Sequence, residues 1–382
     1  MSLNPPSQAP SAEDEGRAKL QGYTLLHHLG SGRFAEVSAY RCERSGRQVA
    51  IKKVSREAHR GGINLGALKE LQVLQELSAH PNLVSLLDVF AFGERMHLVL
   101  ELCDFSLDSV ARDTRVALPE AAVKGIMQQL LQGLAHVHGR RFMHRDIKPE
   151  NVLVAGGGVC KLADFGLAAA TAPSAAAAPA SSSPAPLHHA VVTLWYRAPE
   201  LLMRSATHGA AVDMWSMGCL LAELLLRAPI FPGCPSGAGE EEAAQLAAIA
   251  RLLGAPVDPL ADAPAARRAL AASGLRQCDL EAMLGGQAPG RGLSAPMPLW
   301  PGCAALPGMP GMPEGLSPQP WRTMHPALAA ASSACVDLLS RLLVWDPLLR
   351  LTVGEALAHP WFTSPPLPAH PRDLPKSFSG SE

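Results

Sequence analysis

Two short motifs in the middle of the chain constrain its fold most, because they place chemically specific side chains in a fixed order: HRDIKPEN at residues 144–151 and LADFG at residues 162–166. Asp146 can accept a proton from an attacking hydroxyl and orient it, and Lys148 can stabilise charge on a phosphate. Asn151 and Asp164 supply the hard oxygen atoms that Mg²⁺ prefers. The pattern therefore predicts a site for phosphoryl transfer.

A lysine in the strand-like run VAIKKV needs a partner if it points inward, since burying an unpaired ammonium is costly. Lys52 lies in this run, and Glu70 lies on the helical stretch that follows. A pair between them would hold Lys52 against the α- and β-phosphates of a nucleotide. Taken in isolation, a lysine that extends to solvent and an exposed helical glutamate explain the two positions better. The neighbouring motifs are what favour the ion pair.

The run LGSGRFAEV lies at the start of the strand-rich part of the chain. Small residues in a turn let backbone N–H groups approach phosphate oxygens. A tight hairpin without a ligand explains the run about equally well, and Ala35 stands where a third glycine is expected. The residues of this candidate nucleotide-binding loop are Leu29, Gly30, Ser31, Gly32, Arg33, Phe34, Ala35, Glu36 and Val37.

These motifs occur together and in this order in eukaryotic protein kinases, which residues 23–362 resemble. The resemblance extends to APE at residues 198–200 and to DMWSMGC at residues 213–219, the family's buried helix whose Asp anchors the catalytic loop. In the family, the residues at the positions of Glu200 and Arg350 form a pair. The resemblance implies an α+β, bilobal protein-kinase fold. It has a small antiparallel-sheet N-lobe with one key helix and a larger, mainly helical C-lobe.

The resemblance also implies ATP and Mg²⁺ as cofactors and assigns residues that hold the adenine ring. Val37, Ala50 and Leu153 would sandwich the ring. The backbone groups of Glu101 and Cys103 would hydrogen-bond its edge, with Leu100 beside them as the gatekeeper.

Further roles that the resemblance implies concern the phosphate acceptor. HRDIKPEN is the Ser/Thr-kinase form of the catalytic loop. Thr193 would brace Asp146 and Lys148. Arg197, in the run WYRAPE, goes with substrates that have Pro after the phosphoacceptor, so the expected partners are proteins with Ser-Pro or Thr-Pro sites.

A narrower resemblance is to the cyclin-dependent kinases and their relatives. It rests on KELQVLQELSAHPNLVSLLDVF, VVTLWYRAPELL, VDMWSMGCLLAELLLRAPIFPG and ALAHPWF. The tail FTSPPLPAHPRDLP is similar to that of cell-cycle-related kinase, a subgroup linked to the cell cycle and to control of ciliary length. The cyclin-activating-kinase branch is nearly as close. The resemblance makes a cyclin or another activating subunit an expected partner, although INLGALKE matches the cyclin-contacting helix of the group only in part.

Local patterns divide the chain as follows. Residues 1–22 are expected to be disordered, residues 23–362 form the kinase domain, and residues 363–382 are a polar tail. Within the domain we expect an N-lobe over about 23–102, a C-lobe over about 107–362, an activation segment at 164–200 and an enlarged, largely disordered insert over about 255–320.

Five leucines, spaced by three from residue 65 to residue 77, indicate a helix with a leucine face against the sheet. Further helices are expected at about 119–138, after Asp213 as N-cap, and near 240–253, 334–344 and 353–359.

Composition excludes several other classes. The formal net charge of −1 gives no reason to expect nucleic-acid binding. The 8 cysteines lack a C-x-x-C pair, which argues against structural zinc and a disulfide framework and favours a reducing compartment. The N-terminus lacks the apolar run of a signal peptide, and the most apolar stretch carries Glu223 and Arg227. We therefore expect no membrane insertion and a cytoplasmic or nuclear protein, with ciliary association as a further expectation.

Several positions depart from the kinase pattern. Arg33 and Phe34 replace the Thr-Tyr pair that carries inhibitory phosphorylation in relatives, so that control is expected to be absent. His188 stands where relatives carry the activating Thr, and Ser183, followed by Pro184, is a candidate replacement. A catalytically inactive scaffold of the same fold is the alternative that these departures leave open. The three positions whose Arg side chains hold the phosphate in relatives are here Lys69, Arg145 and Ala169.

Overall fold

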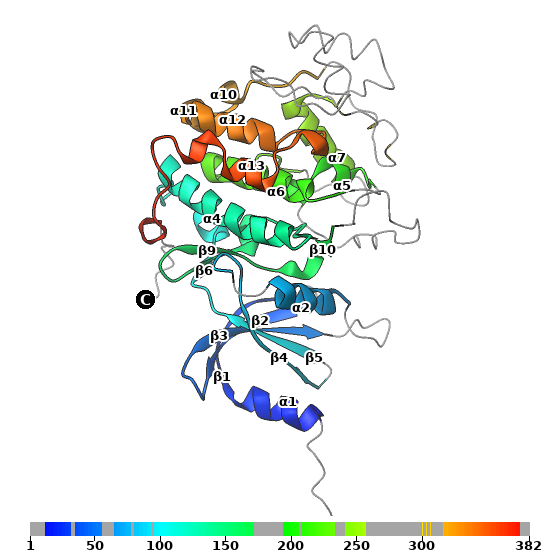
Figure 1. Cartoon of the computed structure of the whole chain (residues 1–382), viewed down its shortest axis with the longest axis vertical. Coiled ribbons are helices and arrows are strands. Elements are labelled where there is room, and N and C mark those ends of the chain that lie inside the picture. Colours follow the sequence, from blue (N-terminus) through cyan, green and yellow to red (C-terminus); the bar gives the residue numbers. More distant parts are fainter. Residues whose placement is uncertain are drawn as a thin grey trace, which may run out of the picture.

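The computed structural model describes most of the chain. The described ranges are 12–31, 35–55, 65–77, 80–93, 95–171, 194–205, 208–233, 241–256 and 316–374, with the single residues 300, 303 and 306. The expected α+β, two-lobed arrangement is confirmed, with a sheet-based lobe below a helical lobe in Figure 1.

The N-lobe is built on one antiparallel sheet with the order β1-β2-β3-β5-β4. Val37 pairs with Lys52 across β2 and β3, and Ala50 pairs with Leu100 across β3 and β5. Because successive side chains in a strand point to opposite faces, Ala50 and Lys52 face the same side of the sheet. The strands are β1 (Tyr23–Ser31), β2 (Ala35–Cys42), β3 (Gln48–Ser55), β4 (Leu86–Phe92) and β5 (Arg95–Glu101).

Helix α1 (Ala12–Gln21) covers the outer face of this sheet, so the expectation of disorder through residue 22 is wrong for this segment. Leu20 packs on a cluster of sheet residues, and Lys19 forms an ion pair with Asp88 at 3.1 Å. An apolar sheet face exposed to water favours such a cover. The cluster consists of Tyr40, Val49, Ile51, Phe90 and Val99.

Helix α2 (Leu65–Leu77) follows β3, and only part of its leucine row is buried. Leu68 is exposed, whereas Leu74 and Leu77 are buried. Steps of three residues drift by about 60° around a 3.6-residue helix, so a row of five leucines winds from one face to another. Glu70 lies on the buried side, with 3% of its surface exposed.

Two long helices form the centre of the C-lobe: α4 (Glu120–Gly139) and α6 (Ala211–Leu226). Both have fully buried faces, consistent with the predicted core helices. The expectation that Asp213 is the N-cap of α6 is wrong. Asp213 lies in the first turn of this helix and is completely buried. The other helices are α3 (Asp108–Ala111), α5 (Pro199–Leu202), α7 (Glu241–Leu253), α10 (Trp321–Met324), α11 (Pro326–Ala330), α12 (Ser333–Leu342) and α13 (Val353–Leu357).

Short strands lie between the lobes. A three-stranded sheet has the order β6-β8-β9, and β10 pairs with β7. The strands are β6 (Phe105–Ser106), β7 (Phe142–Met143), β8 (Val152–Ala155), β9 (Val159–Leu162) and β10 (Ala169–Ala170). Short 3-10 helices are η1 (Pro149–Asn151), η2 (Phe165–Leu167), η3 (Leu194–Tyr196), η5 (Pro347–Leu349), η6 (Pro360–Phe362) and η7 (Pro371–Asp373).

Two segments expected to be outside the core contribute to it. Most of the insert lies outside the described residues, but its residues Trp300 and Cys303 are buried in the main core. The tail packs on α4 as far as Leu374, which is buried, and is therefore not simply a polar tail. Lys124 of α4 donates to the carbonyls of Ser364 and Pro366 at 2.8 and 2.7 Å, which fixes the start of the tail.

Within the described ranges, every helix is too short or too polar to cross a membrane.

Candidate active site

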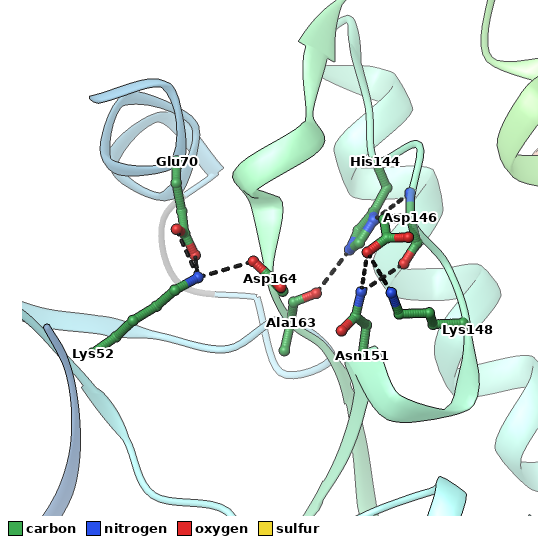
Figure 2. A network of polar contacts seen from close by, with 8 residues as sticks. All are labelled: Lys52, Glu70, His144, Asp146, Lys148, Asn151, Ala163 and Asp164. Atoms are coloured by element: carbon green, nitrogen blue, oxygen red, sulfur yellow. Dashed lines mark hydrogen bonds and ion pairs between the residues drawn. The ribbon is translucent and has the colours of Figure 1, made fainter. Parts of the chain in front are cut away.

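Lys52 joins two lobes through its ammonium group. Its Nζ lies 2.8 Å from both carboxylate oxygens of Glu70 on α2 and 2.9 Å from Oδ1 of Asp164 (Figure 2). Burial by itself lowers the pKa of Lys52, but the two carboxylates outweigh it and raise that pKa, so the lysine is charged at neutral pH. The ion pair predicted from the sequence is therefore formed, and it brings in Asp164 as a third member.

Asp164 is held as a carboxylate in an unusual backbone conformation. Its φ of 61° lies in the left-handed region, which is uncommon for residues other than glycine. Partial burial raises its pKa, but the ammonium of Lys52 more than compensates, and the pKa of Asp164 is lowered. The side chain thus presents a charged oxygen toward the gap between the lobes.

The catalytic loop converges on one oxygen of Asp146. Its Oδ2 accepts hydrogen bonds from Lys148 Nζ at 2.9 Å and from Asn151 Nδ2 at 2.7 Å. The amide of Asn151 also donates to the backbone carbonyl of Asp146 at 2.8 Å. Lys148 therefore lies beside the proposed base, and Figure 2 shows all three side chains gathered in one loop.

His144 connects this loop to the segment before Asp164. It is completely buried, and its Nε2 lies 3.0 Å from the carbonyl of Ala163. Its Nδ1 accepts from the backbone N–H of Asp146 at 3.3 Å, so the proton of a neutral ring lies on Nε2, which donates to that carbonyl. The ring also packs against Phe165 in a tilted arrangement, with centroids 4.7 Å apart. One histidine thus fixes both motifs relative to each other.

Asp213 holds the backbone of the catalytic loop, as the resemblance implies. Its carboxylate accepts from the backbone N–H groups of His144 and Arg145 at 2.9 and 2.7 Å and from His138 Nε2 at 2.8 Å. Arg145 has a φ of 64°, and these bonds keep it in that strained conformation. Burial alone would raise the pKa of Asp213, but the bonds from His138 and from the loop backbone lower it.

The oxygen donors expected for Mg²⁺ fit that role. Because the amide nitrogen of Asn151 donates to Asp146, its Oδ1 is directed away from that bond and is available to a cation. Asp164 adds a charged carboxylate. Mg²⁺ commonly binds through one or two protein groups together with waters and substrate phosphates. Asn151 and Asp164 would therefore hold the ion, which neutralises charge on the phosphates when bound.

The residues expected around the adenine ring lie on the strands that border the gap between the lobes. Ala50 is buried on β3, while Val37 on β2, Leu100 on β5 and Leu153 on β8 are partly buried. Burial, followed by the nearby charge of Glu101, raises the pKa of Cys103 to about 12. The Cys103 thiol is therefore uncharged at neutral pH. The backbone contacts of Glu101 and Cys103 with adenine stay predictions.

A buried lysine that the sequence did not predict lies behind the hinge, the segment from Glu101 to Cys103 that joins the two lobes. Lys161 on β9 pairs with Oε1 of Glu101 at 2.9 Å and donates to the carbonyl of Leu83 at 3.3 Å. Glu101 also accepts from the backbone N–H of Ser85 at 2.7 Å. The side chain of Glu101 thus fastens the hinge to the C-lobe. A single lysine in VCKL carries no sequence signal for this contact.

The end of the activation segment is fixed to the C-lobe. Arg350 forms two parallel bonds with Glu200 at 2.6 and 2.7 Å, and both side chains are buried. This confirms the pair predicted from the sequence, and the two-point geometry is the strong form of an Arg–carboxylate contact. Arg197 is partly buried, and burial lowers its pKa, while the nearby charges of Glu242 and Asp146 oppose this shift.

Several predicted residues lie outside the described part of the chain. They are Gly32, Arg33, Phe34, Thr193, Ser183 and His188. Leu29, Gly30 and Ser31 at the end of β1, and Ala35, Glu36 and Val37 at the start of β2, flank the loop from both sides.

The positions that would hold an activation-segment phosphate are sparsely basic. Lys69 is exposed on α2, and Ala169 lies in β10. Arg145 is partly buried, and its Nε already donates to the carbonyl of Leu167 at 2.7 Å. One partly engaged arginine and one exposed lysine thus stand in place of three arginines.

Comparison with known proteins places these features in a family. Residues 23–362 match the family described as "Protein kinase domain". Cyclin-dependent kinase 7 of Xenopus laevis is 34% identical over 364 residues, which cover 94% of this chain and 86% of that protein. Serine/threonine-protein kinase crk1 of Schizosaccharomyces pombe is 33% identical over 354 residues, which cover 93% of this chain and 88% of that protein.

A solved structure agrees with this match. The structure of the CAK complex from Chaetomium thermophilum bound to ATP-gamma-S contains a chain that is 32% identical, with a TM-score of 0.74. The alignment covers 96% of this chain and 99% of that one. The chain described here therefore belongs to the protein kinase family, within the group of the cyclin-dependent kinases and their relatives.

Proposed function

We propose that this protein is an ATP-dependent serine/threonine kinase directed at Ser-Pro and Thr-Pro sites. The observation that carries the proposal is that Asp146, Lys148 and Asn151 share a hydrogen-bonded cluster, while Lys52 and Asp164 form an ion pair. Each of these side chains has a distinct task in phosphoryl transfer, and all are present.

The residues divide the reaction between the lobes. Asp146 accepts the proton of the substrate hydroxyl and orients that oxygen toward the γ-phosphate. Lys148 stabilises the negative charge on the transferring group, and Lys52 holds the α- and β-phosphates. Asn151 and Asp164 would hold Mg²⁺, which would neutralise charge on the phosphates when bound. The bond to the γ-phosphate forms at the substrate oxygen, and the bond to the β-phosphate oxygen of ATP breaks.

The comparisons support ATP and a protein partner without fixing either for this chain. The Chaetomium structure is named as a CAK complex bound to ATP-gamma-S, and several relatives are named as cyclin-dependent kinase 7. We infer that ATP is the phosphate donor and that a cyclin or a similar activating subunit binds the chain. A cell-cycle role in the nucleus or cytoplasm agrees with those names. The same names support the alternative that places the chain in the cyclin-activating-kinase branch. The link to cilia stays a prediction.

A scaffold that binds nucleotide without transferring phosphate is the second candidate, and one observation favours it. Ala35 replaces the third glycine of the nucleotide-binding loop, at the first residue of β2. The added methyl group restricts how closely that backbone approaches a phosphate.

Transfer of labelled phosphate from ATP to a Ser-Pro peptide separates the two candidates. We expect transfer by the wild-type chain, loss of it in Asp146→Asn, and wild-type transfer in Asp373→Asn, which removes an exposed carboxylate of the tail. Nucleotide binding without transfer in the wild-type chain, assayed with and without a cyclin partner, would support the scaffold instead.

A further inference from the structure

The carboxyl end of α2 is attached to the C-lobe by a histidine of α4. Nε2 of His136 lies 2.8 Å from the carbonyl of Leu77, the last residue of α2. The final carbonyls of a helix have no partner within the helix, and α2 has no basic residue in its last turn. His136 therefore caps α2 from the other lobe.

Neighbouring contacts assign the proton of His136. The carbonyl of Leu77 only accepts hydrogen bonds, so Nε2 of His136 carries the proton in this contact. Arg140, the residue that follows α4, directs its guanidinium NH1 to both ring nitrogens, and it can then donate only to Nδ1, which lies 3.2 Å away. The ring of His136 thus donates to the carbonyl of Leu77, in the direction that the cap requires.

A second histidine, from the segment that follows α2, packs against this ring in a tilted arrangement. The rings of His80 and His136 lie 4.8 Å apart, centroid to centroid. Nδ1 of His80 accepts from the backbone N–H of Asn82 at 3.1 Å, which requires an unprotonated nitrogen. Asn82 in turn lies against Gly133 of α4, where an added Cβ would be 2.7 Å from its carbonyl oxygen. The segment after α2 is therefore pressed onto α4.

The same turn of α4 also reaches the catalytic loop. His138, two residues after His136, bonds Asp213, which holds the backbone of His144 and Arg145. One helical turn is thus attached to α2, which carries Glu70, and to the loop that carries Asp146.

We propose that His136 is a positioning residue for the transfer reaction, holding α2 and thereby Glu70 on the C-lobe, and that His80 makes this attachment sensitive to protonation. This deepens the proposed function, and it concerns the geometry of Lys52 and Glu70 rather than the chemical step.

The surroundings of the His80 ring favour its neutral form. The groups that act on His80 are His136 of α4, Arg140 directly after α4 and Lys161 of β9, all of them basic. Lys161 is itself paired with Glu101 of β5. Burial and then these three neighbours lower the pKa of His80. A proton on Nδ1 of His80 would also remove the acceptor for Asn82.

The direction of the pH dependence follows. The pKa of His80 is lower in the folded chain than its usual value of about 6.5 in the unfolded chain. The attachment is therefore complete above that pH and is lost as the pH falls below it.

Hydrogen exchange of the α2 amides tests the proposal on the full chain without any need for kinase activity. In His136→Phe, which keeps a ring but loses the donor, the amides near the end of α2 should exchange on the order of fivefold faster at pH 7.5, as expected for one lost hydrogen bond. In His136→Gln the amide nitrogen replaces the donor, and protection should return.

The proton dependence is tested by comparing pH 7.5 with pH 5, after correction for intrinsic exchange rates. Wild-type protection should fall at pH 5, whereas His80→Asn should keep it, because an Asn oxygen accepts from the backbone two residues later without titrating. The control is His27→Gln, an exposed histidine of β1, which should behave like wild type.

Two results would overturn the proposal: unchanged protection in His136→Phe, or the same loss at pH 5 in His80→Asn as in wild type. Failure of the chain to phosphorylate peptides would refute the proposed function but leave both measurements valid.

Discussion

The two halves of the active site are held in different ways. The cluster of Asp146, Lys148 and Asn151 lies within one loop of one lobe, and its backbone is fixed by the completely buried Asp213. The bridge between Lys52, Glu70 and Asp164 joins β3, α2 and the segment after β9. The first is assembled locally, whereas the second depends on the placement of a whole helix. We therefore expect activity to be regulated through the bridge, by changes in the position of α2.

The largest expected effect comes from the locally assembled half. Asp146→Asn keeps the size of the side chain but removes the acceptor of the hydroxyl proton. Turnover should fall by about 10² to 10⁴, the usual contribution of general-base catalysis. Steady-state kinetics of peptide phosphorylation measures this fall. ATP affinity and the melting temperature should stay close to wild type, since the bridge is untouched; undiminished turnover would remove Asp146 from the mechanism.

The bridge should respond differently, with a smaller loss that appears in the use of ATP. Glu70→Ala leaves Lys52 with Asp164 alone, and Lys52→Met leaves Glu70 buried without its cation. A hydrogen bond to a charged group is worth about 1.5–3 kcal/mol, so kcat/KM for ATP should fall by about 10- to 100-fold in each.

The double variant tests whether the two residues act as one unit. Glu70→Ala with Lys52→Met should cost little more than either change alone, because residues in one ion pair are not additive. Additive losses, or a neutral Glu70→Ala, would show that the pair is absent from the working state. A matched control is Glu76→Ala, an exposed glutamate on the same helix.

The contrast between the halves also explains what the sequence could predict. The catalytic cluster follows from short motifs whose members have fixed chemical tasks, and the pair of Glu200 and Arg350 follows from the resemblance to protein kinases. Helices α4 and α7 follow from local patterns and differ from the expected bounds by a residue or so. These features depend on nearby residues or on chemistry that few residue types can supply.

Contacts that join distant segments were not predictable in the same way. The leucine row of α2 is only partly buried: Leu74 and Leu77 pack in the main core, whereas Leu68 is exposed. Helix α1 is polar along most of its length, and its position depends on the apolar sheet face beneath it and on the ion pair of Lys19 with Asp88. Lys161 and His136 have partners 60 and 59 positions away along the chain, and no spacing rule connects them.

The choice of peptide substrate should distinguish the two halves of the active site further, because it depends on the C-lobe alone. Arg197 lies near the end of the activation segment, and we expect peptides with Ser-Pro or Thr-Pro to be preferred over Ser-Ala controls by about tenfold, the discrimination that one apolar contact gives. A peptide library measures the preference. The same ratio is expected in Glu70→Ala, since the bridge does not touch the peptide, and a library profile without preference for Pro would reject the prediction.

The smallest expected effect concerns the activation segment, where we predict that no phosphate is required. A phosphate orders a loop through one to three charge-assisted hydrogen bonds, usually to arginines. Here Lys69 is exposed, Ala169 offers no charge, and Arg145 already donates to the carbonyl of Leu167. The usual acceptor position holds His188, which lies outside the described residues.

Loss of the acceptor and loss of the clamp point the same way, whereas a chance substitution would alter one and leave the other. We therefore expect that protein shown by mass spectrometry to be unphosphorylated between Asp164 and Glu200 changes its turnover by less than about twofold after treatment with an upstream kinase, in line with the weak effect of exposed charge pairs. A bound partner is then the expected source of order in this segment, and adding a cyclin should raise turnover more than phosphorylation does.

Ser183→Ala is the critical control, because Ser183 precedes Pro184 and is the best substitute acceptor. Strong stimulation that tracks a new phosphate and disappears in Ser183→Ala would show that the switch has moved along the segment rather than been lost, and control would then lie in the C-lobe as well as at the bridge.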